Sequence, residues 1–183
     1  MGDISAIDIN NGNLLWQTPT QSSLAFDTGF FLKTSDVVAD KDALFFSNNQ
    51  NQFFSLDIQT GNLNWKQEIN SNLRPVIIND LIFTISMEGY LIIMEKNTGN
   101  IIRSNYLLNK FKAKNRLKIR PAGFIVGNKN IYLSTNIGRF LVIDIATGKT
   151  GTILKIDNKK ISRPAIFNKN LYLITDNSII KLN

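Results

Sequence analysis

The sequence predicts an all-β fold, a β-propeller segment of about four blades in which each blade is a sheet of four antiparallel strands. A short unit that joins an acidic residue to a turn glycine recurs along the 183 residues. The recurring glycines lie 49, 38 and 49 positions apart, close to the roughly 40–45 residues of a four-stranded blade. No segment shows a sustained helical period with caps, so little helix is expected.

The repeated unit begins at a small turn residue and ends at a glycine ten positions later. The four pairs are Gly2 and Gly12, Asn51 and Gly61, Gly89 and Gly99, and Gly138 and Gly148. Between them the chain reads DISAIDINN, QFFSLDIQT, YLIIMEKNT and RFLVIDIAT, and a fifth copy starts at Asn177. Runs such as YLIIM are apolar at successive positions, which is typical of strands buried on both faces between neighbouring sheets.

Each unit closes with the same hairpin chemistry. The acid six places after the first turn is Asp8, Asp57, Glu95 or Asp144, and the residue before the glycine is Asn11, Thr60, Thr98 or Thr147. Glycine supplies a positive φ, and the acid and the Asn or Thr oxygen can accept backbone N–H groups across the turn. General acid–base catalysis needs two unlike carboxyls in one cleft, so we interpret these acids as turn-stabilising rather than catalytic.

A second hairpin precedes each unit. Its strands are expected in VVADKDALFFS, VIINDLIFTIS, FIVGNKNIYLST and AIFNKNLYLIT, and the last three follow Arg-Pro pairs that start at Arg74, Arg120 and Arg163. This hairpin supplies strands A and B of a blade, and the repeated unit supplies strands C and D. The sequence therefore divides into a partial blade at 2–17, blades at about 33–70, 73–108 and 119–156, and a partial blade at 162–183.

Composition excludes several kinds of chemistry. The chain has no cysteine and no histidine, which removes thiol nucleophiles, disulfides, Ser-His-Asp triads and zinc sites with sulfur or imidazole ligands. The start MGDISAID has neither the charged n-region nor the apolar h-region of a signal peptide, and no apolar run is long enough to span a bilayer. Residues 1–91 carry a net charge of −6 and residues 92–183 carry +13, which indicates an anionic partner or an AT-rich genome. We expect no enzyme activity, catalytic residue, cofactor or metal.

One segment interrupts the repeat with its own pattern. In NKFKAKNRLKIRP, residues 109–121, mostly apolar residues alternate with six cations: Lys110, Lys112, Lys114, Arg116, Lys118 and Arg120. An extended chain would place all six on one side, either as an edge strand that lysines protect from aggregation or as a docking strip for partners. Those partners would be an acidic protein loop or anionic lipid headgroups. Nucleic acid is not expected, because only Phe111 in the strip could stack on a base.

The unit AIDINNGNLLW, with its looser copy SLDIQTGNLNW, resembles the repeat of the PQQ-like β-propeller family. Within that family the order of the copies is most similar to the C-terminal half of the BamB group, lipoproteins of the outer-membrane β-barrel assembly machinery. The resemblance implies a non-enzymatic scaffold that binds proteins of that machinery. It also implies a periplasmic, lipid-anchored, eight-bladed parent protein. Family contacts to the central assembly subunit come largely from the other half, so no partner-contact residue carries over.

The same family includes PQQ-dependent dehydrogenases, which supply the alternative function. On that alternative the chain binds a small ligand in a central funnel, or derives from a quinoprotein dehydrogenase. Those enzymes use a vicinal cysteine pair, a tryptophan platform and calcium-binding carboxylates. This chain has no cysteine, and Trp16 and Trp65 each fall four residues after a turn glycine, where we interpret them as structural.

The two partial blades leave three arrangements open. Counted with the three complete blades they give close to four blades, and an arc of that size would expose an apolar sheet face at each end. The segment could be a fragment of a longer parent or a lone four-bladed ring. Alternatively, a homodimer of half-propellers could close an eight-bladed ring, with the acidic half of one chain against the basic half of the other.

Overall fold

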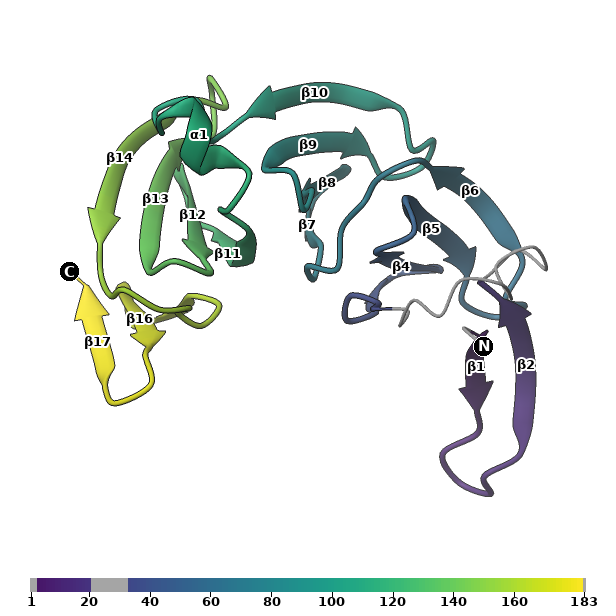
Figure 1. Ribbon diagram of the computed structural model, residues 1–183. Coiled ribbons are helices and arrows are strands. Elements are labelled where there is room, and N and C mark those ends of the chain that lie inside the picture. The colour runs from purple at the N-terminus through teal and green to yellow at the C-terminus, as the bar shows by residue number, and fades with distance from the viewer. Residues whose placement is uncertain (1–2, 21–32, 183) are drawn as a thin grey trace.

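The computed structural model describes residues 3–20 and 33–182; Gly2, the first of the predicted turn residues, lies outside them. The described ranges contain 17 strands and one helix of four residues, so the predicted all-β fold is confirmed. The four-residue helix is too short to span a bilayer, and these ranges hold no other helix. The sheets follow one another in an arc, with the two ends of the chain at opposite ends of it (Figure 1).

Five antiparallel sheets follow the chain, and every hydrogen-bonded neighbour is also a sequence neighbour. The first holds β1 (Asp3–Ile7) and β2 (Leu14–Pro19). Three four-stranded sheets follow: β3 (Val38–Asp40), β4 (Ala43–Asn48), β5 (Gln52–Asp57) and β6 (Leu63–Gln67); β7 (Val76–Ile78), β8 (Leu81–Ile85), β9 (Tyr90–Glu95) and β10 (Ile101–Tyr106); and β11 (Pro121–Val126), β12 (Asn130–Thr135), β13 (Arg139–Asp144) and β14 (Thr150–Lys155). The last holds β15 (Ala165–Phe167), β16 (Asn170–Ile174) and β17 (Ile179–Leu182).

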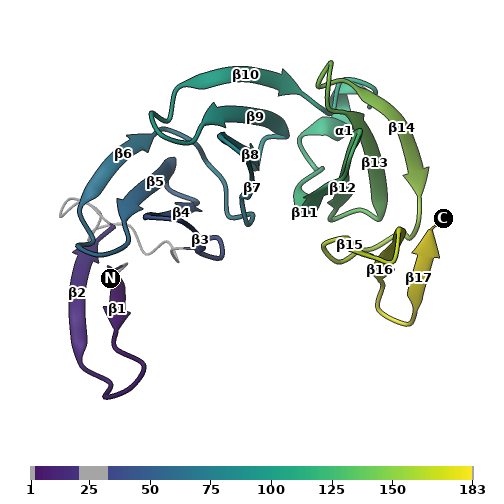
Figure 2. The same cartoon turned by 180° about the vertical axis from the view of Figure 1, so that it is seen from behind.

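This order matches a partial propeller with three complete sheets and two partial ones. The first strand of each four-stranded sheet lies on the inside of the arc, and the last strand lies on its outer rim (Figure 1 and Figure 2). We propose that each sheet is one blade, with the boundaries predicted from the repeat.

The four recurring glycines occupy equivalent hairpins. The φ angles of Gly12, Gly61, Gly99 and Gly148 are 75°, 72°, 73° and 66°. In each hairpin the glycine N–H donates to the carbonyl oxygen of the repeat acid, at 2.8–2.9 Å. A non-glycine residue reaches this left-handed conformation only with strain, so glycine is the residue that the turn requires.

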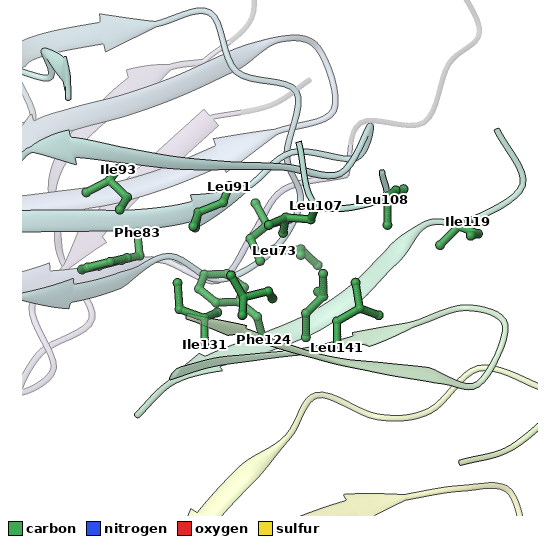
Figure 3. Packing of buried hydrophobic residues seen from close by; sticks show 13 residues of the cluster. Leu73, Phe83, Leu91, Ile93, Leu107, Leu108, Ile119, Phe124, Ile131 and Leu141 are labelled. Carbon is green, nitrogen blue, oxygen red and sulfur yellow. The ribbon is translucent and has the colours of Figure 1, made fainter. Parts of the chain in front are cut away.

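The core forms where neighbouring sheets face each other. Residues 91–94 of β9 are buried at four successive positions, as expected for a strand covered on both faces. The largest cluster joins Phe83, Ile85, Leu91 and Ile93 of one sheet to Phe124, Ile131, Leu133, Leu141 and Ile143 of the next (Figure 3). Hydrophobic burial therefore stabilises pairs of adjacent sheets rather than one central core.

Three side chains on the outer strands fasten the first four sheets to one another. Trp16, Trp65 and Arg103, here called the turn-docking residues, each lie four residues after a turn glycine. Each donates to the carbonyl oxygen that directly follows the acid of the next unit: Trp16 Nε1 to Ile58 at 3.1 Å, Trp65 Nε1 to Lys96 at 3.0 Å, and Arg103 Nη1 to Ile145 at 2.9 Å. The turn of one sheet is therefore the receptor for the outer strand of the sheet before it.

The turn glycines also make room for the turn-docking residues. A Cβ atom on Gly61 would lie 2.4 Å from the ring of Trp16, and one on Gly99 would lie 2.6 Å from the ring of Trp65. A Cβ on Gly12 would meet nothing within 4 Å in the described structure. Gly61 and Gly99 are thus required twice, by the positive φ of the turn and by the ring packed on each of them.

The lowered pKa values of two repeat acids, Asp57 and Asp144, predict how the stability of the fold changes at low pH. The pKa of Asp57 is lowered below the ordinary 3.8 mainly by the hydrogen bond from the Thr60 hydroxyl and next by the hydrogen bond from the Thr60 backbone N–H. The same two groups of Thr147 lower the pKa of Asp144. A lowered pKa in the folded state stabilises the fold above the unfolded pKa, and this stabilisation disappears as the pH falls through the folded pKa. We expect a T60V/T147V variant to melt below the parent chain at pH 7, by a margin that shrinks at pH 2. An equal margin at both pH values in thermal melting would contradict this assignment.

Candidate functional site

The basic segment forms a compact loop between β10 and β11. The prediction of an extended strand with six aligned cations is wrong, because residues Ala113–Arg116 form the short helix α1. Arg116 holds the loop closed, since its Nε donates to the carbonyl of Phe111 at 2.9 Å and its Nη2 to that of Asn109 at 2.7 Å. Residues 109–120 pair with no neighbouring strand as a β-ladder, and the side chain of Arg116 satisfies two of the loop's own backbone carbonyls. We call residues 109–120 the basic loop.

Both ends of the basic loop are anchored to the body of the arc. Ile119 is buried in the largest core cluster, and Phe111 packs against the same cluster. The Lys110 ammonium donates to the carbonyl oxygen of Gly151 in β14. The guanidinium of Arg116 also lies over the ring of Tyr106, 5.9 Å from its centroid. The loop is therefore a fixed projection from the surface.

The predicted cations consequently separate into two groups. Lys110, Arg116 and Arg120 donate side-chain hydrogen bonds to backbone carbonyl oxygens. Lys112, Lys114 and Lys118 are exposed, and none of these three forms an ion pair within residues 3–20 and 33–182. Leu117 lies between them in sequence and is 81% exposed. Three exposed ammonium groups close in sequence to an exposed leucine can bind an acidic surface that also offers an apolar contact.

The repeat acids stabilise turns. Asp57 accepts hydrogen bonds from the backbone N–H and the hydroxyl of Thr60, both at 2.8 Å, and Asp144 accepts the same pair from Thr147 at 2.7 Å. The described residues contain no group of three or more His, Cys, Asp or Glu side chains that could hold a metal ion. Because each acid is bound within its own turn, the structure brings no two of them into one cleft.

Known proteins resemble this chain in sequence and in fold. The family model described as outer membrane protein assembly factor BamB matches residues 1–105. The outer membrane protein assembly factor BamB of Legionella pneumophila (strain Paris) is 24% identical over 140 residues, 75% of this chain and 31% of that protein. The chain thus spans about a third of the length of this curated relative.

Solved structures show the same fold at low sequence identity. BamB from Moraxella catarrhalis matches with a TM-score of 0.59 and 14% identity, over 98% of this chain and 66% of that one. The β-propeller domain of Cps50 (Swd1) from Myceliophteria thermophila matches with a TM-score of 0.71 and 12% identity, over 98% of this chain and 58% of that one. At these identities the likeness shows the fold alone, which is a propeller.

Proposed function

Because the chain belongs to the family of the outer membrane protein assembly factor BamB, we propose that it is a non-enzymatic scaffold that supports the assembly of outer-membrane β-barrel proteins. The observation that carries this proposal is the family match over residues 1–105, more than half of the chain. On this proposal the protein that contains the chain is periplasmic and associated with the outer membrane. It acts by presenting a fixed surface to other proteins of the machinery.

We propose the basic loop as one docking element of this scaffold. It lies just beyond the residues that the family model matches, and it is held rigidly by Ile119 and Arg116. Rigid presentation favours binding, because less side-chain and loop freedom is lost when the partner docks. Its exposed lysines favour an acidic protein surface as the partner. Anionic lipid and a second copy of this chain are the alternative partners.

The proposal is tested by measuring binding of the purified chain to the periplasmic parts of each protein of the barrel-assembly machinery in turn. We expect saturable binding that weakens roughly tenfold or more in a K112E/K114E/K118E variant, because three charges at the interface change sign. The matched control is K149E/K155E/K160E, which makes the same change of net charge at exposed lysines outside the basic loop. The control is expected to bind within about twofold of the parent chain.

Each of three other results would contradict a different part of the proposal. Absence of binding by the parent chain would contradict the scaffold role. An equal loss in both triple variants would contradict the role of the basic loop and leave only a general effect of charge. Binding to vesicles that contain anionic lipid, lost in the loop variant alone, would assign the loop to a lipid surface instead.

A further inference from the structure

The Arg-Pro pairs bring cations to the inside of the arc. Arg120 directly precedes β11, whereas Arg74 and Arg163 each lie two residues before their strands, β7 and β15. These are the innermost strands of their sheets (Figure 2). In the sheet that begins with β3, the corresponding residue is Asp36, two residues before Val38. The family assignment gives no role to any of these four residues.

Two of the three arginines share the same cavities. Arg74 and Arg163 both line a cavity of about 920 Å³ beside β3 and β7, and both also line a smaller one of about 170 Å³. Asp36 lines the smaller cavity, whereas Arg120 lines neither of the two. The smaller cavity is therefore lined by two guanidinium groups that lie 89 positions apart in the sequence, and by one carboxylate.

A glycine allows Arg163 to reach this position. A Cβ atom on Gly123 of β11 would lie 2.5 Å from Cβ and 2.6 Å from Cα of Arg163. The second of these is a backbone atom, so a side chain at residue 123 would displace the strand rather than only bend a side chain. Arg163 Nε donates to the carbonyl oxygen of Phe124 at 3.1 Å, which fixes the direction of the side chain. The two terminal nitrogens of the guanidinium make no hydrogen bond to the described residues and remain available for a ligand.

The charges around the two arginines leave a local excess of positive charge. Burial lowers the pKa of Arg163, the Arg74 charge lowers it further, and Asp36 acts in the opposite direction. Asp36 forms no ion pair with either arginine within the described ranges. In the larger cavity the carboxylates of Asp40 and Asp80 lie 2.6 Å and 3.9 Å from Lys96 Nζ, and Lys41 forms no ion pair within the described ranges. The two arginines therefore repel each other without a dedicated counter-ion.

We propose that Arg74 and Arg163 form a binding site for a phosphate group on the inside of the arc. A tetrahedral dianion matches two guanidinium groups in charge, and each planar guanidinium can donate to two of its oxygens. The small cavity suits the phosphate itself, and the larger one next to it leaves room for the rest of a phosphomonoester. The ligand class is thus inorganic phosphate or a small phosphomonoester. The site is independent of the proposed scaffold role, which places its docking element in the basic loop.

The test is titration calorimetry of the full chain with inorganic phosphate and with glycerol phosphate, at constant ionic strength. We expect R74Q to weaken phosphate binding about tenfold or more, because a hydrogen bond to a charged group contributes at least that much. D36N is expected to strengthen binding, since it removes the competing negative charge. R120Q is the matched control, because it changes the same Arg-Pro position outside both cavities, and its affinity is expected to stay within about twofold of the parent value. Tighter binding of glycerol phosphate than of phosphate would identify the monoester as the ligand class.

A second variant reports on the close approach at β11. G123A is expected to weaken phosphate binding as R74Q does, because the new Cβ would displace Arg163. R74Q is expected to keep the melting temperature of the parent chain, because the side chain of Arg74 is exposed. Three results would overturn the proposal: no phosphate binding by the parent chain, equal loss in R74Q and R120Q, or weaker binding in D36N.

Discussion

Replacing Trp65 with alanine is expected to lower the free energy of unfolding by about 3 kcal/mol, the lower end for a large aromatic residue because Trp65 is only half-buried. The indole has three roles at once. It packs on Gly99 of the next sheet, donates to the carbonyl oxygen of Lys96, and stacks on Phe53 with the ring centroids 5.9 Å apart. The alanine variant removes the contact between two adjacent sheets as well as part of the core within one of them.

A W65F variant separates these contributions. Phenylalanine keeps an aromatic ring for stacking on Phe53 and loses the hydrogen bond to Lys96, so we expect a loss of about 1 kcal/mol. Urea unfolding followed by circular dichroism measures both variants. A W65A variant that unfolds within about 0.5 kcal/mol of the parent chain, the range of an ordinary surface substitution, would show that the sheets do not depend on this contact.

Replacing Gly61 with alanine is expected to destabilise the chain by about 2–4 kcal/mol, from strain at positive φ and from overlap with a packed ring. The φ angle of Gly61 is 72°, and its new Cβ would lie 2.4 Å from the ring of Trp16. Gly12 provides a matched control within the same chain. Its φ of 75° is nearly the same, but a Cβ there meets nothing within 4 Å of the described structure. G12A is therefore expected to lose only about 1–2 kcal/mol, the part due to backbone strain.

The difference between the two alanine variants isolates the packing between sheets. Urea unfolding of G61A, G12A and the parent chain gives this difference directly. Equal losses in G61A and G12A would mean that only the turn conformation requires glycine and that Trp16 does not press on residue 61. A further variant, G61A/W16A, should then lose less than the sum of its single changes if the overlap is real.

The sequence alone was sufficient to predict the fold, because residues close together in the chain define each turn of the repeat. An acid, a threonine or asparagine, and a glycine define a hairpin without reference to the rest of the chain, and four such hairpins fix where strands C and D begin and end. Strands that are apolar at successive positions then require a cover on both faces. Together these features predicted sheets stacked in series, which the structure and the comparisons confirm.

The contacts between sheets were harder to predict. Trp16 and Trp65 were identified as repeat residues, but the repeat does not say which turn each indole contacts. Arg103 occupies the same column and was missed, because a guanidinium and an indole share little in a sequence pattern. Both donate an N–H group to a turn carbonyl from a flat side chain, and this shared geometry is the signal that could have identified Arg103.

The candidate sites depend on tertiary structure even more. Alternation of cations predicted an extended strip, whereas Arg116 closes the basic loop through backbone carbonyls only a few residues away. The Arg-Pro pairs were visible in the sequence, yet nothing local shows that Arg163 meets Arg74 and that Arg120 lines neither cavity. Arg163 reaches its position because Gly123 of the neighbouring sheet has no side chain, a contact between residues 40 positions apart.

The central claim is that the turns of Gly61, Gly99 and Gly148 each receive a side chain from the preceding sheet. Proton NMR of the turn glycines is its most direct test. The Hα resonances of Gly61 and Gly99 are predicted to move upfield in the ring currents of Trp16 and Trp65, with cross-relaxation to the indole protons. Gly12 is predicted to show neither effect. Three glycines with the same ordinary shifts and no indole contacts would contradict the packing of sheet on sheet described above.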